Sequence, residues 1–160
     1  QIFLADDTIA ANIAFGQDQK KIDDLAVKRA SKIANLHNFV ENELPSKYQT
    51  VVGERGIRLS GGQRQRIGIA RALYNSPNIL ILDEATNALD NLTEDAVMRD
   101  LINSYKNTTI IIITHRINTV KKCDNIFFID KGEVKGEGNF KKLIEVSDKF
   151  RETADKLKML

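Results

Sequence analysis

The chain has 160 residues, of which 42% are hydrophobic and 29% are charged, and its formal net charge is +2. This length and composition are typical of a folded protein with a sizeable core, and so small a net charge gives no support for a nucleic acid or an anionic membrane surface as partner. No run of about 18 apolar residues occurs, which excludes a membrane-spanning helix.

The first half of the chain, residues 1–77, is predicted to be mainly helical. Residues 6–16 begin with capping side chains and end at Gly16, a favoured C-terminal cap. Apolar side chains, Leu25 among them, recur every three or four residues over 21–44 and predict a helical segment that ends before Pro45. Residues 48–59 contain two glycines and are predicted to form a loop, and residues 60–75 a third helix.

The second half, residues 78–160, alternates predicted strands and helices. Continuous apolar runs at 78–83, 108–114 and 125–130 predict strands, and helices are expected over 93–105, 115–123 and 139–160. The segment 132–138 is expected to return as a hairpin. Apolar strands separated by helices indicate an α/β fold with a parallel sheet covered on both faces.

The first candidate site lies where a predicted strand ends in the sequence ILILDEA, residues 79–85. Asp83 and Glu84 would lie at the carboxyl end of the strand, where ligands bind in open parallel sheets. An aspartate there can hold Mg²⁺, and the next carboxylate can activate a water molecule. The simpler explanation is that both acids cap the following helix.

A second candidate is His115, which follows the apolar run at 108–114. A histidine at a strand end can contact a phosphate, although a single histidine at such a place is more often incidental. The two strand ends are expected to bring His115 together with Asp83 and Glu84.

The third candidate is the helix start LSGGQRQR, residues 59–66. Ser60 is a good N-cap, and Gln63 stands at the spacing of a capping box. Gly61 and Gly62 each weaken a helix by roughly 1 kcal/mol, which indicates that access to the backbone is needed. A helix N-terminus of this kind binds phosphate well, although an ordinary capped helix would carry the same residues.

Together, in this order, LSGGQ, ILILDE, NALD and the histidine of IIITHR closely resemble the ATP-binding cassette of ABC transporters. LSGGQ is similar to the signature motif, ILILDE to Walker B, NALD (87–90) to the D-loop, and His115 to the switch histidine of the H-loop. The resemblance covers about residues 1–145, and TIAANIAFG and VGERG favour an exporter. It implies the C-terminal part of a P-loop NTPase-like domain, with a helical subdomain at 1–77 and half of the α/β core at 78–160.

The resemblance also implies residue roles. Asp83 would serve Mg²⁺, Glu84 would activate water and His115 would stabilise the γ-phosphate of ATP. In a head-to-tail pair of cassettes, Asp90 would link the two sites, and ATP bound to the second cassette would be contacted by the signature residues Ser60, Gly61, Gly62 and Gln63. Hydrolysis would power transmembrane domains, with lipids or lipid-linked saccharides as the expected cargo.

The phosphate-binding loop GxxxxGK[ST] does not occur in the 160 residues, so the chain alone is expected to be almost inactive. The first residue is Gln1, which predicts a piece of a longer chain, and the single cysteine, Cys123, suits a reducing compartment. The expected place is the cytoplasmic face of a membrane, within a transporter.

Two other interpretations remain open at this stage. ABC-type ATPases of DNA repair or chromosome maintenance share these motifs, although a coiled coil or zinc module usually interrupts them, and neither pattern occurs here. A non-catalytic partner cassette is the other. Among the remaining residues, His37 and Cys123 are expected to be structural, and Arg64, Gln65 and Arg66 to lie on a solvated or partner-facing surface.

Overall fold

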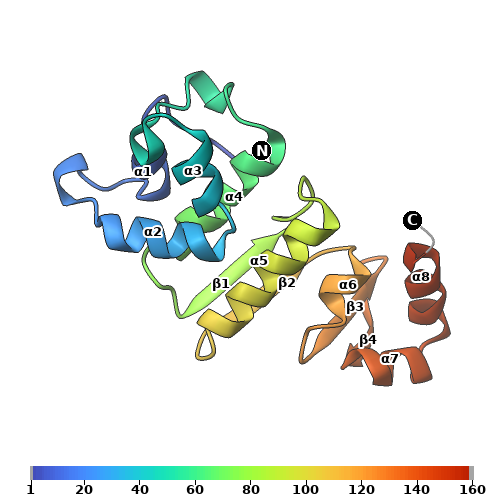
Figure 1. Cartoon of the computed structure of the whole chain (residues 1–160). Helices are drawn as coiled ribbons and strands as arrows, with labels where there is room; N and C mark the ends of the chain where they lie inside the picture. Colours follow the sequence, from blue (N-terminus) through green and yellow to red (C-terminus); the bar gives the residue numbers. More distant parts are fainter. Residues whose placement is uncertain (1, 159–160) are drawn as a thin grey trace. The chain divides into compact units, whose positions relative to one another are not determined.

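The computed structural model describes residues 2–158, with side chains described as far as residue 155. The chain divides into two compact units, Gln1–Ile112 and Ile113–Leu160 (Figure 1). The division at residue 77 that the sequence suggests remains a prediction. In the described part of the chain, every helix is too short or too polar to cross a membrane.

The first unit contains five helices, two strands and three short 3₁₀ turns among its described residues. They are α1 (Ile9–Ile13), α2 (Asp24–Ile33), α3 (His37–Glu43), α4 (Gly61–Leu73), β1 (Ile79–Asp83), α5 (Asn91–Ser104) and β2 (Thr109–Ile113), with the turns at Gln19–Lys21, Lys47–Gln49 and Glu54–Gly56.

Helices α1, α2 and α4 pack against one another around a shared apolar core. Each contributes side chains that are almost completely shielded from solvent: Ile9 and Ile13 of α1, Val27 and Ala30 of α2, and Ile67 and Leu73 of α4. Burial of several large aliphatic side chains, each stabilising by roughly 1.5–3 kcal/mol, holds these helices together. The helical character predicted for this region is confirmed.

The helical segment predicted to continue to Pro45 is two helices. Asn35 adopts a left-handed backbone with φ 52° and separates α2 from α3, a conformation that asparagine tolerates better than most residues. Leu25, one of the apolar side chains expected on the buried face of this helix, is 78% exposed. It lies in the first turn of α2, on the side opposite the buried face.

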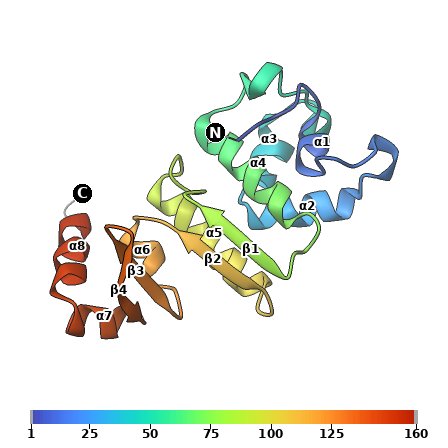
Figure 2. The same cartoon turned by 180° about the vertical axis from the view of Figure 1, so that it is seen from behind.

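Strands β1 and β2 form a small two-stranded parallel sheet, joined through α5. Figures 1 and 2, seen from opposite sides, show α5 lying over one face of this sheet. Leu80 and Leu82 of β1 point into the same core as Met98 of α5. On the other face, Ile79 and Ile81 are each 62% exposed, so the expectation of a sheet covered on both faces is wrong within the described residues.

The second unit contains α6 (Ile117–Val120), β3 (Ile126–Asp130), β4 (Glu133–Gly138), α7 (Phe140–Val146) and α8 (Asp148–Lys158). Strands β3 and β4 pair as an antiparallel hairpin, which confirms the return expected over 132–138. Strand β3 is therefore not part of the parallel sheet to which the sequence assigns it. Lys131 and Gly132 both have positive φ, the combination of a tight two-residue hairpin turn. The single helix predicted from residue 139 is two helices, because Ser147 is extended.

The hairpin and the C-terminal helices share a small aromatic core. The ring of Phe150 meets Phe128 at 5.3 Å and Phe140 at 5.6 Å between centroids, both edge-on. A Cβ on Gly136 would lie 2.8 Å from a methyl carbon of Leu143, so only glycine lets β4 approach α7 this closely. This core is therefore built from β3, β4, α7 and α8 of the second unit.

Candidate functional site

The start of α4 has the geometry that the sequence predicts. The Gln63 backbone N–H donates to the Ser60 hydroxyl at 3.2 Å, and the Ser60 backbone N–H donates to Gln63 Oε1 at 2.8 Å. This reciprocal pair is a capping box and fixes the first turn. Ser60 is exposed, and the positive end of the helix dipole is suited to an anion.

The two glycines after Ser60 face the loop formed by residues 87–90. A Cβ on Gly62 would lie 3.2 Å from the Ala88 carbonyl oxygen, and one on Gly61 would lie 3.6 Å from Ala88 Cβ. The glycines therefore allow two backbones to approach, in addition to leaving the helix start open. The sequence pattern alone does not predict this contact.

The segment 64–66 differs from the surface that the sequence suggests, because all three side chains bind carbonyl or amide groups of the chain itself. Arg64 Nη1 donates to the carbonyls of Leu59 and Gly56, and Arg66 Nη1 donates to that of Asn35. Gln65 Oε1 accepts from the Ala88 backbone N–H at 2.7 Å. Burial lowers the pKa of Arg66. These residues are half-buried and hold the start of α4 in place, so they are less solvated than expected. The alternative that they face a partner remains a prediction.

Asp83 and Glu84 lie at the carboxyl end of β1, as predicted, and both are exposed. Glu84 adopts a left-handed backbone, with φ 46°, a strained conformation of the kind that functional sites often retain. The Asn87 side-chain amide donates to Glu84 Oε2 at 2.9 Å. The carboxylate is thus held by the 87–90 loop at a position open to solvent.

Asp90 closes the same loop and caps α5. Its carboxylate accepts from the Thr93 backbone N–H at 2.9 Å and from the Thr93 hydroxyl at 2.7 Å. Hydrogen bonds from the Thr93 side chain, then from its backbone, lower the pKa of Asp90. Asp90 therefore carries a negative charge at neutral pH.

His115 belongs to the second unit, lies two residues after the end of β2 and is exposed. Beside it, the Arg116 backbone N–H donates to the Thr114 hydroxyl at 3.0 Å, which shapes the chain as it leaves the strand. The strand-end position is as predicted. The meeting of His115 with Asp83 and Glu84 remains a prediction.

The carboxylates at the end of β1 suit a Mg²⁺ ion whose other ligands are phosphate oxygens and water. The described residues contain no group of three or more histidine, cysteine, aspartate or glutamate residues able to enclose a metal ion. Mg²⁺ is commonly held by one or two carboxylates, with phosphates and water completing its octahedral shell. The exposed Asp83 carboxylate fits such a role.

Two interior polar residues that stabilise this region are not evident from the sequence. The buried Asn12 side chain bonds both the N–H and the carbonyl of Ala5, at 2.9 and 3.0 Å. Arg71 donates to the Asn12 carbonyl at 2.8 Å and to the Phe3 carbonyl at 2.9 Å, and its guanidinium lies 4.6 Å from the Phe15 ring centroid. The contacts of Arg71 join residues up to 68 positions apart, so no local sequence pattern predicts them.

His37 and Cys123 have the structural roles that the sequence predicts. His37 Nδ1 shares a hydrogen bond of 2.8 Å with the Tyr48 hydroxyl, and the two rings stack. The half-buried Cys123 thiol donates weakly to the Thr119 carbonyl, and burial raises its pKa. Both side chains thus make contacts within their own unit of the chain.

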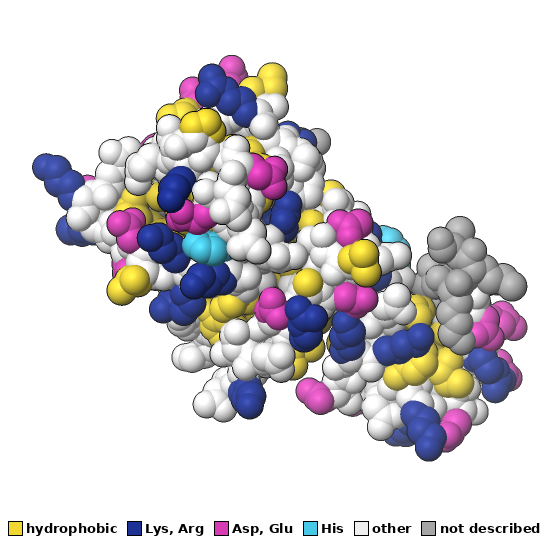
Figure 3. Space-filling view, in the orientation of Figure 1, with side chains coloured by type: hydrophobic (Ala, Val, Ile, Leu, Met, Phe, Trp, Pro, Cys, Tyr) yellow, Lys and Arg dark blue, Asp and Glu magenta, His cyan; other side chains and the backbone are white. Residues whose placement is uncertain are grey.

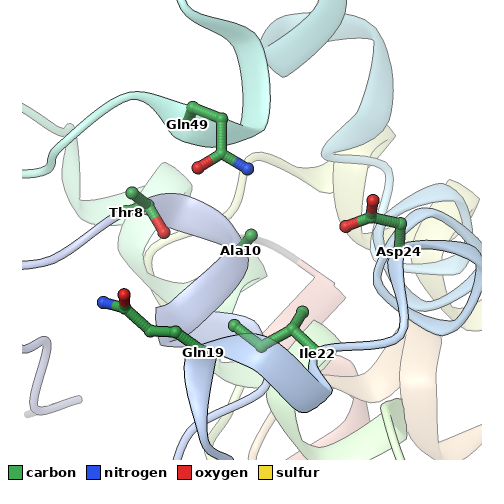
Figure 4. A pocket seen from close by; sticks show the side chains of 6 residues that line it. All are labelled: Thr8, Ala10, Gln19, Ile22, Asp24 and Gln49. Atoms are coloured by element: carbon green, nitrogen blue, oxygen red, sulfur yellow. The ribbon is translucent and has the colours of Figure 1, made fainter.

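One pocket in the first unit lies apart from the candidate residues. It has a volume of about 290 Å³ and is lined by Thr8, Ala10, Gln19, Ile22, Asp24 and Gln49 (Figure 4). None of the predicted site residues lines it. On the face shown in Figure 3, side chains of both charges are interspersed, in keeping with the small net charge.

Comparison with known proteins identifies the family. The family model described as "ABC transporter" matches residues 4–87. An ATP-dependent lipid A-core flippase of Saccharophagus degradans is 48% identical over 147 residues, which cover 92% of this chain and 25% of the flippase. ATP-binding cassette sub-family B member 5 of Mus musculus is 41% identical, over 89% of this chain and 11% of that protein.

Among solved structures, that of a bacterial Atm1-family ABC exporter with ATP bound matches with a TM-score of 0.88 and 37% sequence identity. The match covers 96% of this chain and 26% of the exporter. The chain therefore spans about a quarter of the length of the flippase and of this exporter.

Proposed function

Since the chain belongs to the ABC transporter family, we propose that it forms part of an ATP-binding and ATP-hydrolysing cassette of an exporter. Residues 1–77 would be its helical subdomain and residues 78–160 the C-terminal half of its α/β core. The protein would act at the cytoplasmic side of a membrane, joined to transmembrane domains.

One observation carries the proposal. The start of α4, the 87–90 loop and Glu84 form a continuous contact path: Gly62 and Gln65 pack on Ala88, and Asn87 binds the Glu84 carboxylate. A helix start that favours an anion and an exposed carboxylate that can activate water are thus connected through one short loop. An ordinary capped helix gives no reason for this link.

The residue roles follow from the chemistry of each group. ATP supplies the phosphoryl group to be transferred to water. Glu84 orients or deprotonates the attacking water, and Asp83 holds Mg²⁺. Ser60, Gly61, Gly62 and Gln63 offer a hydroxyl, backbone N–H groups and an amide to the γ-phosphate bound on a second cassette. His115, expected beside Asp83 and Glu84, stabilises the γ-phosphate of the ATP bound on its own cassette. Asp90 links the two ATP sites across the interface between the cassettes.

The test uses a chimera of the Saccharophagus degradans flippase in which this chain replaces the matching quarter. Such a chimera contains a complete cassette, and we expect Mg²⁺-dependent ATPase activity from it. Glu84→Gln keeps an acceptor for Asn87 but removes the base, and is expected to lower kcat at least about 100-fold. The matched control is Glu145→Gln, at an exposed glutamate of α7. Equal turnover in Glu84→Gln and Glu145→Gln would contradict the assigned role.

For the cargo, we propose a lipid or a lipid-linked saccharide, because several similar proteins are named lipid A-core flippases. The measurement is ATP-dependent translocation of a fluorescent lipid A-core analogue by the whole protein in vesicles. Glu84→Gln should abolish translocation. Transport of a water-soluble peptide in place of the lipid would count against this assignment.

A further inference from the structure

We propose that Gln65 is a positioning residue for Glu84. Through Ala88 and Asn87, it links the first two turns of α4 to the carboxylate, so that the anion-binding helix start and the water-activating group are held in one fixed arrangement. The inference rests on the proposed function, in which Glu84 activates water. It adds a role for Gln65, which contacts neither nucleotide nor water in this account.

The first step is the hydrogen bond from the Ala88 backbone N–H to Gln65 Oε1, 2.7 Å long and spanning 23 residues of sequence. Gln65 is half-buried and Ala88 is exposed, so this hydrogen bond lies at the surface of the first unit, above the packed residues around it. The side chain of Gln65 thus connects the 87–90 loop, at Ala88, to the second turn of α4.

The second step is the packing around Ala88. Gly62 leaves space for the Ala88 carbonyl, and the neighbouring Leu89 is buried in the core of the first unit. The Leu89 backbone N–H donates to the Thr86 carbonyl at 2.9 Å, and the Thr86 hydroxyl donates to the buried carboxylate of Glu94 at 2.8 Å. The buried end of the loop is therefore held by Thr86 and Leu89. Gln65 determines where its exposed residues, Asn87 and Ala88, lie.

The third step connects the loop to Glu84 by two hydrogen bonds from Asn87. Its backbone N–H donates to the Glu84 carbonyl at 3.2 Å, and its side-chain amide donates to Glu84 Oε2 at 2.9 Å. The left-handed backbone of Glu84 is strained and persists only where the surroundings enforce it. Release of the loop from Gln65 would let the carboxylate move, and misplacement of a catalytic group by about 1 Å lowers rates strongly.

The test compares three variants in the flippase chimera. Gln65→Leu has a similar volume but no acceptor, and it should lower kcat roughly tenfold while the KM for ATP changes less than about twofold. Gln65→Glu retains an oxygen acceptor and should keep most of the turnover. The matched control, Gln17→Leu, places the same substitution at an exposed glutamine after α1 and should behave as wild type.

A second readout follows the loop directly. Hydrogen exchange of the peptide containing residues 84–90 should become faster in Gln65→Leu and stay slow in Gln65→Glu and Gln17→Leu, because only the first removes the acceptor of the Ala88 N–H. The inference is overturned if Gln65→Leu turns over within twofold of wild type, if Gln65→Glu is as slow as Gln65→Leu, or if exchange is unchanged. An unsubstituted chimera without ATPase activity would instead count against the proposed function.

Discussion

Gly62 lies so close to the 87–90 loop that a Cβ added to it would be 3.2 Å from the carbonyl oxygen of Ala88. At the preceding glycine the nearest contact would be 3.6 Å, an ordinary packing distance. The two glycines of the LSGGQ motif therefore have different structural requirements, although the sequence presents them as a pair.

This difference predicts opposite effects of two alanine substitutions on stability. Gly61→Ala should raise the free energy of unfolding by about 0.5 kcal/mol, because alanine favours the helix. Gly62→Ala must displace the Ala88 carbonyl and should be less stable than Gly61→Ala by about 1 kcal/mol. Urea unfolding of the 160-residue chain measures both. Equal stability of the two variants would contradict the prediction, because it would mean that the 87–90 loop moves away from position 62 without cost in free energy.

Asp90 is predicted to stabilise the chain in a pH-dependent way. Its pKa is lowered in the folded state by its bonds with Thr93, so its stabilising effect is complete above the ordinary value of about 3.8 and is lost as pH falls through the lower folded value. Asp90→Ala should lower the melting temperature by about 3 °C at pH 7. The gap between Asp90→Ala and wild type should narrow below pH 4, and a gap that widens with acid would contradict the prediction.

Arg71 is expected to stabilise the first unit strongly. Arg71→Met would leave the carbonyls of Asn12 and Phe3 without these donors and remove the cation from the Phe15 ring, lowering the free energy of unfolding by about 2 kcal/mol. The control is Arg99→Met, whose arginine pairs with Asp100 at the surface and should change stability by less than about 0.5 kcal/mol. Chemical unfolding of both variants gives the comparison.

The elements that local sequence specifies could be predicted, as the start of α4 illustrates. Ser60 and Gln63 are three residues apart and bond to each other, so their spacing alone indicates the capping box. The strand end at Asp83 can be predicted in the same way, because an apolar run followed by two acidic residues indicates where the strand stops. Both predictions depend on neighbours in the chain.

The contacts that assemble the candidate site were not predictable in this way. Gln65 meets Ala88 across 23 residues, and a polar residue after a helix start looks the same whether it faces solvent or a distant loop. The exposed face of β1 was missed for a related reason: the apolar run shows that Ile79 and Ile81 are suited to burial, but not which segments lie over them. Tertiary packing decides both cases.

The central claim is that the signature residues of this chain act on ATP bound to a second cassette. It is tested most directly by ATPase activity of flippase chimeras purified as pairs of differently tagged subunits. One pair has Glu84→Gln in one subunit and Ser60→Arg in the other, and a second pair has both substitutions in one subunit beside an unsubstituted partner.

If Ser60 and Glu84 of different subunits share a site, the first pair keeps one intact site and about half of the activity, whereas the second pair has a defect in each site and falls to background. The reverse result, with activity kept only when both substitutions are in one subunit, would contradict the account.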